Sequence, residues 1–148
     1  MNLEHPNSIT KPLSLNRLFK KMKFTVDKQE RYTYLKLEES TFNSLIAPDL
    51  KSEFVFYRNE GIKNLILDLS AVEYVDSSGL SAILTAERLW KGFGTFVITG
   101  LVSDNIKKLI TISRLDTVLT IIPTRQEAID YVLMDEIARE IDSDLEEG

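Results

Sequence analysis

From residue 64 onward, short apolar runs alternate with longer segments whose apolar residues recur at helical spacing. Residues 64–69 and 95–99 are nearly continuous apolar runs, as in strands buried on both faces of a parallel sheet. Residues 78–90 carry apolar side chains at every third or fourth position, which predicts a helix between them. Strands that alternate with helices favour a layered α/β domain around a mostly parallel sheet.

The preceding part of the chain predicts a hairpin and one more helix. Residues 24–39 contain two β-rich runs with a short polar connection, which is typical of antiparallel strands. Residues 40–46 are expected to form a loop. A helix is predicted from Pro48 to Glu60, because proline suits a first turn and Gly61 suits a stop.

The remaining elements complete a single domain, expected at residues 23–134. Ser103 is a candidate N-cap for a short helix, and residues 118–122 predict a last strand. Residues 124–127 match a capping box that would open a final helix continuing as far as Ile141. The predicted order is therefore β-β-α-β-α-β-α-β-α, with a mixed, mostly parallel sheet and helices packed on it.

Composition excludes several classes of protein. The 148 residues include no cysteine, which excludes disulfides and thiolate metal sites. No apolar run approaches the ~20 residues of a membrane helix, and the first ten residues lack the apolar core of a secretory signal. We therefore expect a cytoplasmic protein without membrane insertion.

Charge is distributed unevenly along the chain. Residues 1–31 hold seven Lys or Arg against three acids, whereas the last fourteen residues hold seven acids and Arg139. No basic patch alternates with aromatic residues, so direct binding to nucleic acid is not expected. Residues 135–148 are expected to be an acidic helix end and tail.

Residues 1–22 are expected to be a disordered leader. A second interpretation is a basic amphipathic helix that binds a membrane surface or a partner. It rests on the apolar residues Leu15, Leu18, Phe19 and Met22, which recur at helical spacing beside Arg17, Lys20 and Lys21.

The tetrapeptide Asp76-Ser77-Ser78-Gly79 is the principal candidate site. It follows two apolar stretches and precedes the helical pattern that starts at Leu80, so it falls at a strand-to-helix junction. Asp and Ser are favoured N-caps, and a plain cap is one interpretation. The other is a phosphorylated serine, because the first helical turn has unpaired N–H groups and the positive end of the dipole.

The residues around Ser77 do not predict catalysis. A hydrolase elbow needs glycine two residues before its serine, where this chain has Val75. A serine nucleophile also needs a base, and His5 is the only histidine. We therefore do not expect an enzyme.

Cofactor and metal patterns are also incomplete. The segment Gly92-Phe93-Gly94 begins a dinucleotide fingerprint, but Val97 stands where its third glycine belongs. Four carboxylates near the predicted strand ends have no recognised ligand spacing; they are Asp68, Glu73, Asp76 and Asp104. No cofactor or metal is expected.

The sequence Leu-Asp-Leu-Ser-Ala-Val-Glu-Tyr-Val-Asp-Ser-Ser-Gly-Leu at residues 67–80 resembles the core of STAS domains, most closely the bacterial anti-sigma factor antagonists. The resemblance covers about residues 23–134. It implies that Ser77 is phosphorylated by an anti-sigma factor serine kinase and dephosphorylated by a PP2C-type phosphatase. The unphosphorylated protein would bind the anti-sigma factor and release the sigma factor, which is partner switching in bacterial transcription regulation.

The resemblance also implies a partner surface at the start of the predicted helix, formed by Asp76, Ser78, Gly79 and Leu80. Asp76 would orient the Ser77 hydroxyl or engage the metal-nucleotide site of the kinase. Two segments depart from the family: residues 38–44 lack the glycine often found there, and Arg114 stands where many relatives have glycine. The alternative function is a non-phosphorylated STAS subunit or scaffold that regulates a transporter ATPase or a signalling complex.

Overall fold

The structure is a computed structural model that describes residues 22–147, with the backbone alone for Glu147. The expected leader therefore lies outside the described residues, except for Met22, which is buried in the core. None of the helices within residues 22–147 is both long enough and apolar enough to span a bilayer.

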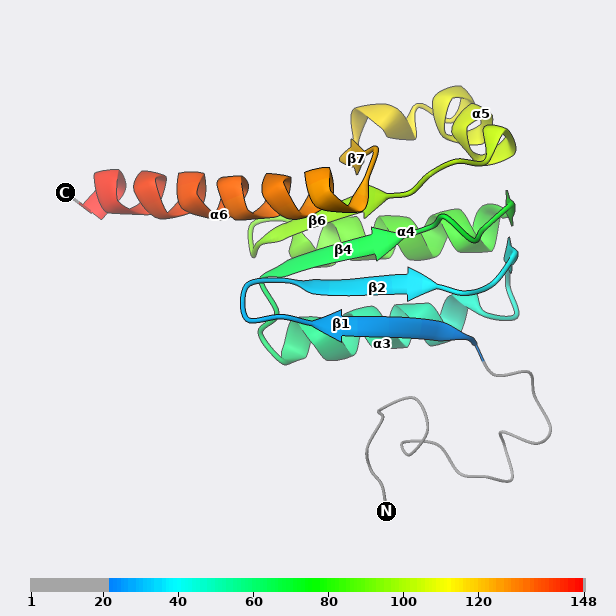
Figure 1. The fold of residues 1–148 in the computed structure, drawn as a ribbon, viewed down its shortest axis with the longest axis horizontal. Coiled ribbons are helices and arrows are strands. Elements are labelled where there is room, and N and C mark those ends of the chain that lie inside the picture. The colour runs from blue at the N-terminus through cyan, green and yellow to red at the C-terminus, as the bar shows by residue number, and fades with distance from the viewer. Residues whose placement is uncertain (1–21, 148) are drawn as a thin grey trace, which may run out of the picture.

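Five strands of the described residues form the main sheet, in the order β1-β2-β4-β6-β7 (Figure 1). β1 is antiparallel to β2, and every other neighbouring pair is parallel. The predicted mixed, mostly parallel sheet is confirmed. The strands are β1 (Phe24–Lys28), β2 (Thr33–Leu37), β4 (Asn64–Asp68), β6 (Thr95–Thr99) and β7 (Ile121–Ile122).

Helices cover both faces of this sheet. α3 (Ala47–Asn59) and α4 (Ser77–Trp90) pack against each other on one face, whereas α6 (Arg125–Glu147) packs on β4, β6 and β7 from the other. α5 (Asp104–Ile112) follows β6 and precedes β7. The predicted helix stop at Gly61 and the Ser103 cap are confirmed, since Gly61 has φ +83° and Ser103 Oγ accepts from the Ile106 N–H at 3.3 Å.

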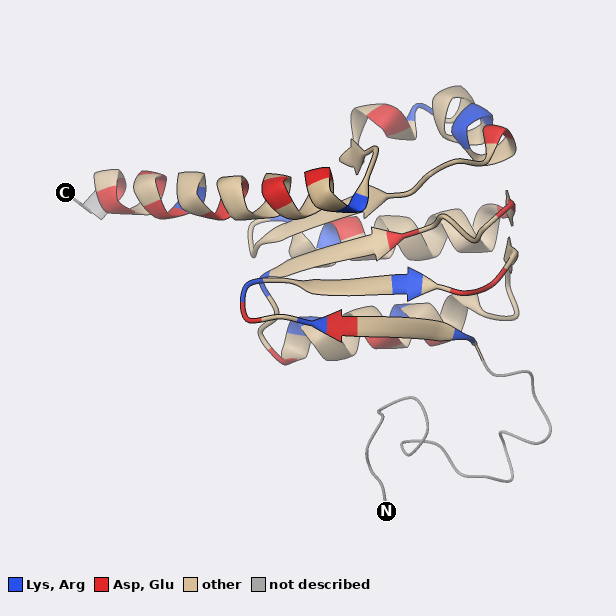
Figure 2. Ribbon diagram, viewed as in Figure 1, with Lys and Arg blue, Asp and Glu red and all other residues tan. Residues whose placement is uncertain are grey.

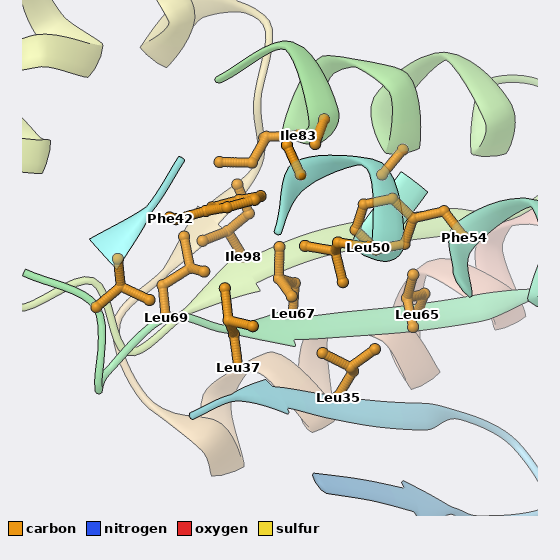
Figure 3. Packing of buried hydrophobic residues seen from close by; sticks show 14 of the residues in the cluster. Leu35, Leu37, Phe42, Leu50, Phe54, Leu65, Leu67, Leu69, Ile83 and Ile98 are labelled. Carbon is orange, nitrogen blue, oxygen red and sulfur yellow. The ribbon is translucent and has the colours of Figure 1, made fainter. Parts of the chain in front are cut away.

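The alternation of side chains along the strands separates two apolar layers. Leu35, Leu65 and Leu67 belong to the larger core cluster, together with residues of α3 and α4 (Figure 3). The intervening residues Tyr34 and Ile66 belong to the smaller cluster under α6. Burial on both faces explains why these strands are nearly continuous apolar runs in the sequence.

The segment expected as a loop at residues 40–46 contains a short strand, β3 (Thr41–Phe42). β3 pairs in parallel with β5 (Tyr74–Val75), which lies just before α4. The loop expectation was wrong here because the pairing joins segments more than 30 residues apart and leaves no local pattern in the sequence. Phe42 is fully buried by this arrangement.

The strand predicted at residues 118–122 is shorter than expected. A 3₁₀ turn, η1 (Leu115–Thr117), precedes it, and β7 contains only Ile121 and Ile122. Arg114 has φ +63°, which bends the chain, and the Leu119 N–H bonds back to the Leu115 carbonyl. The Val118 N–H also bonds to the Leu115 carbonyl, so Val118 and Leu119 close this turn and the ladder with β6 begins only at the Thr120 carbonyl, which accepts from the Ile98 N–H at 2.9 Å.

α6 begins with the predicted cap and ends later than expected. Thr124 Oγ1 accepts from the Glu127 N–H at 3.2 Å and donates to the Glu127 carboxylate at 2.8 Å. The helix continues past Ile141 to Glu147, because no glycine or proline interrupts it before Gly148. Its last turns project beyond the amino ends of β4 and β6 (Figure 1).

Candidate functional site at the start of α4

Asp76 is the N-cap of α4. Its backbone is extended, and its carboxylate accepts the Gly79 N–H at 3.0 Å. The Asp76 carbonyl accepts the Leu80 N–H at 3.0 Å, which closes the first helical turn. The carboxylate is therefore engaged with the backbone of the helix, and capping is the role for which the structure supplies a contact.

Ser77 is the first residue of α4, and its side chain is exposed. Within the described residues its hydroxyl has no hydrogen-bond partner, and Asp76 bonds to Gly79 instead. Ser78 is half-buried. Of the two hydroxyls, that of Ser77 is the more accessible to a modifying enzyme.

Gly79 is buried against the short strand β3. A Cβ atom at this position would lie 2.5 Å from the Phe42 carbonyl oxygen and 3.1 Å from Phe42 Cγ. The same carbonyl accepts the Asp76 N–H at 3.2 Å. Gly79 therefore allows β3 to approach the first turn of α4, and Leu80 beside it is half-buried.

A hollow of about 350 Å³ opens beside Ser77. α4 lines one wall of it, and the start of α3 with the preceding loop lines the other. Among the described residues, Lys51 is the only cation that lines it. The lining residues are Ser44, Ala47, Pro48, Lys51, Ser77, Ser78 and Ser81. Sequence reasoning did not identify Lys51, and it considered Ser44 only as the end of the divergent segment 38–44, although helices that follow parallel strands of one sheet begin at the same sheet edge.

Three exposed apolar side chains occupy segments at this same edge of the sheet. Leu45 lies in the loop before α3, Tyr74 in β5, and Val102 in the loop before α5, with 73%, 55% and 64% of their surface exposed. The Ser103 hydroxyl donates to the Glu73 carbonyl at 2.8 Å and ties the last of these loops to β5. Such side chains are suited to contact a protein partner.

Asp68, one of the carboxylates considered as a metal ligand, has other partners. It accepts the Tyr34 hydroxyl and, at 2.7 Å, the Ser70 N–H. Burial and the neighbouring carboxylate raise the pKa of Tyr34 above its usual value, so its hydroxyl remains a donor. Residues 22–147 contain no group of three His, Cys, Asp or Glu arranged to hold a metal ion.

Comparison with known proteins identifies the family. The model of the STAS domain family matches residues 15–128, so this chain belongs to the STAS domain family. The resemblance drawn from residues 67–80 is confirmed.

Solved structures share the fold. A putative anti-sigma factor antagonist from Thermotoga maritima is 23% identical, with 74% of this chain and 93% of that chain covered and a TM-score of 0.65. The phosphorylated form of the Bacillus cell fate determinant SpoIIAA is 18% identical, with 74% and 99% covered and a TM-score of 0.59. A sulfate transporter family protein from Wolinella succinogenes is 17% identical, with 88% and 97% covered and a TM-score of 0.63. The chain therefore has the fold of anti-sigma factor antagonists.

Proposed function

We propose that this protein is an anti-sigma factor antagonist controlled by phosphorylation of Ser77. The unphosphorylated surface around Ser77 binds an anti-sigma factor kinase, and a phosphoryl group on Ser77 releases it. A PP2C-type phosphatase restores the binding form. The protein acts by binding in the cytoplasm, and Ser77 is a substrate for the chemistry of another protein.

One observation carries this proposal: the Ser77 hydroxyl is exposed, has no hydrogen-bond partner in the described residues, and sits at the first position of a capped helix. A kinase can reach this hydroxyl without disturbing the fold. The N-terminal end of α4 would stabilise the phosphate in the free protein. The structure of SpoIIAA in its phosphorylated form, a neighbour in fold, is consistent with such a modification.

Phosphate would oppose binding through charge and desolvation. It adds about −1.5 to −2 charges beside Asp76, in a protein whose formal charge is already −5. A partner surface that fits a neutral hydroxyl would bury this charge without supplying a counterion of its own. A penalty of about 3 kcal/mol weakens binding roughly a hundredfold, which is enough for a switch. Asp76, Ser78 and Leu80 would border the contact, together with the exposed Leu45 and Tyr74.

The intact mass of the protein purified from its native cells tests the proposal. We expect a fraction heavier by one phosphoryl group, removed by a PP2C-type phosphatase and absent in Ser77→Ala. Ser78→Ala is the matched control and should keep the modification. If the heavier species persists in Ser77→Ala, or never forms in the presence of the cognate kinase, the proposal fails.

The second candidate is a STAS subunit or scaffold that binds a transporter ATPase or a signalling complex without being phosphorylated. The fold shared with the sulfate transporter family protein favours it. In that case the mass of the protein stays unmodified in all growth conditions, and a transporter subunit rather than a kinase copurifies with it.

A further inference from the structure

The outer face of α6 carries an apolar stripe that no other part of residues 22–147 covers. Met134, Ile137, Ile141 and Leu145 are separated by three or four residues and so lie along one side of the helix. Their exposed fractions are 70%, 47%, 54% and 73%. Apolar side chains in a continuous row of this kind are typical of a binding surface.

The opposite face of α6 packs on the sheet, so the stripe faces away from the sheet. A guanidinium nitrogen of Arg139 donates to Asn64 Oδ1 at 2.8 Å and to Thr95 Oγ1 at 2.9 Å. Thr95 Oγ1 in turn donates to the Asp135 carboxylate. Asp135 and Arg139 therefore face β4 and β6, and the stripe faces away from them.

The stripe is bordered by acids. Figure 2 shows Asp and Glu along the projecting half of α6, and Glu140, Asp142 and Asp144 flank the stripe at helical spacing. A second α6 would bring like charges together, which opposes pairing of this helix with itself. The surface instead fits an apolar segment with basic residues.

This chain contains such a segment just before the described residues. Residues 11–21 hold Lys11, Arg17, Lys20 and Lys21 and no Asp or Glu. Their apolar residues are Leu13, Leu15, Leu18 and Phe19. The segment thus complements α6 in charge and supplies apolar side chains for the stripe.

The attachment point of this segment keeps its nearest lysines, Lys20 and Lys21, away from the end of α6 in their own chain. Phe24 pairs with Leu37 at the carboxyl end of β2, whereas α6 projects past the amino ends of the parallel strands. Lys20 precedes Phe24 by four residues and can reach at most about 14 Å from it. The separation of Leu145 from Phe24 includes the length of β1, about 17 Å, and about 9 Å of helix beyond Arg139. It therefore exceeds the reach of Lys20.

We propose that residues 11–21 of one copy bind the α6 stripe of a second copy, so that two copies form a reciprocal dimer. Each copy supplies one basic segment and one α6, as in an isologous two-fold assembly. α6 projects at the sheet edge opposite the start of α4, so the stripe itself lies away from Ser77 (Figure 1). The dimer is independent of the proposed phosphorylation.

The test measures the mass of the full-length protein by light scattering over a range of concentrations. We expect a dimer that dissociates as salt rises, because the bordering charges are exposed. Lys20→Glu with Lys21→Glu should weaken dimerisation at least about tenfold, and Glu140→Lys with Asp144→Lys should do the same. All four changes in one chain should restore the dimer. Lys107→Glu with Lys108→Glu, on exposed positions of α5, is the matched control and should have no effect.

A cross-linking measurement decides between binding in cis and in trans. Light and isotopically heavy protein are mixed and coupled with a carbodiimide, which joins lysine amines to carboxylates. Links from Lys20 or Lys21 to the acids of α6 should join light to heavy chains. In light scattering, the proposal is overturned by a monomer at all concentrations, by a dimer whose affinity the charge reversals leave unchanged, or by a combined variant that does not dimerise again. In cross-linking, it is overturned by links confined to single chains.

Discussion

The carbonyl oxygen of Phe42 lies 2.5 Å from the position that a Cβ atom on Gly79 would occupy. Because the neighbour is backbone, neither rotamer change nor local repacking relieves this contact. The relationship links β3 to the first turn of α4 and so fixes the place of Ser77. It gives Gly79 a structural role, whereas the sequence placed it in the partner surface.

Gly79→Ala should therefore destabilise the fold by about 1–3 kcal/mol, the range for overpacking a tight site. The measurement is the urea midpoint of unfolding. Ser81→Ala, two residues further along α4 and half-buried, is the control and should change the midpoint little. An unchanged midpoint in Gly79→Ala would show that β3 moves away without loss.

The Asp76 carboxylate contributes to helix stability through its bond to the Gly79 N–H. Asp76→Ala should lower the free energy of unfolding by about 1 kcal/mol, whereas Asp76→Asn should retain most of it, because both Asp and Asn cap helices well. Chemical denaturation of the three proteins provides the comparison. If Asp76→Asn keeps the stability and loses phosphorylation, the charge serves the kinase; equal losses in both variants would contradict the capping role.

The ends of the elements were predictable where local chemistry decides them. The apolar run at residues 95–99 predicts β6, and Ser103 predicts the cap of α5. Each signal lies within a few neighbouring residues. The β3–β5 pair was not predictable, because α3 and β4 separate its two short strands in the sequence. The hollow with Lys51 depends on the same long-range packing, so the sequence located Ser77 but not the wall facing it.

Arg114 illustrates a site where a local rule is broken. Its φ of +63° lies in the left-handed region, which glycine adopts without strain. Its side chain is exposed and its backbone N–H bonds to the Thr111 carbonyl. Arg114→Gly should raise the free energy of unfolding by about 0.5–1 kcal/mol. Arg114→Ala removes the same charge without relieving the strain, and an equal gain in that variant would refute this explanation.

Tyr34 should make stability depend on alkaline pH. Its pKa is raised in the folded protein by burial and by Asp68, so the unfolded chain loses the phenolic proton first. The stabilisation is complete below the ordinary tyrosine pKa of about 10 and declines as pH rises above it. We expect the free energy of unfolding to fall less between pH 9 and 11 in Tyr34→Phe than in the wild type. Identical slopes in urea titrations would rule out this contribution.

The proposed switch depends on the charge at Ser77. Variants that add a charge at different positions should therefore distinguish an effect at the start of α4 from an effect of the net charge of the protein. Ser77→Asp should weaken binding to the anti-sigma factor at least about tenfold, and full phosphorylation about a hundredfold, because the partner buries the added charge without supplying a counterion of its own. Ser52→Asp adds the same charge to an exposed position of α3 and should leave affinity nearly unchanged. Isothermal titration with the purified partner measures both, and an equal loss in the two variants would mean that net charge, not the start of α4, governs binding.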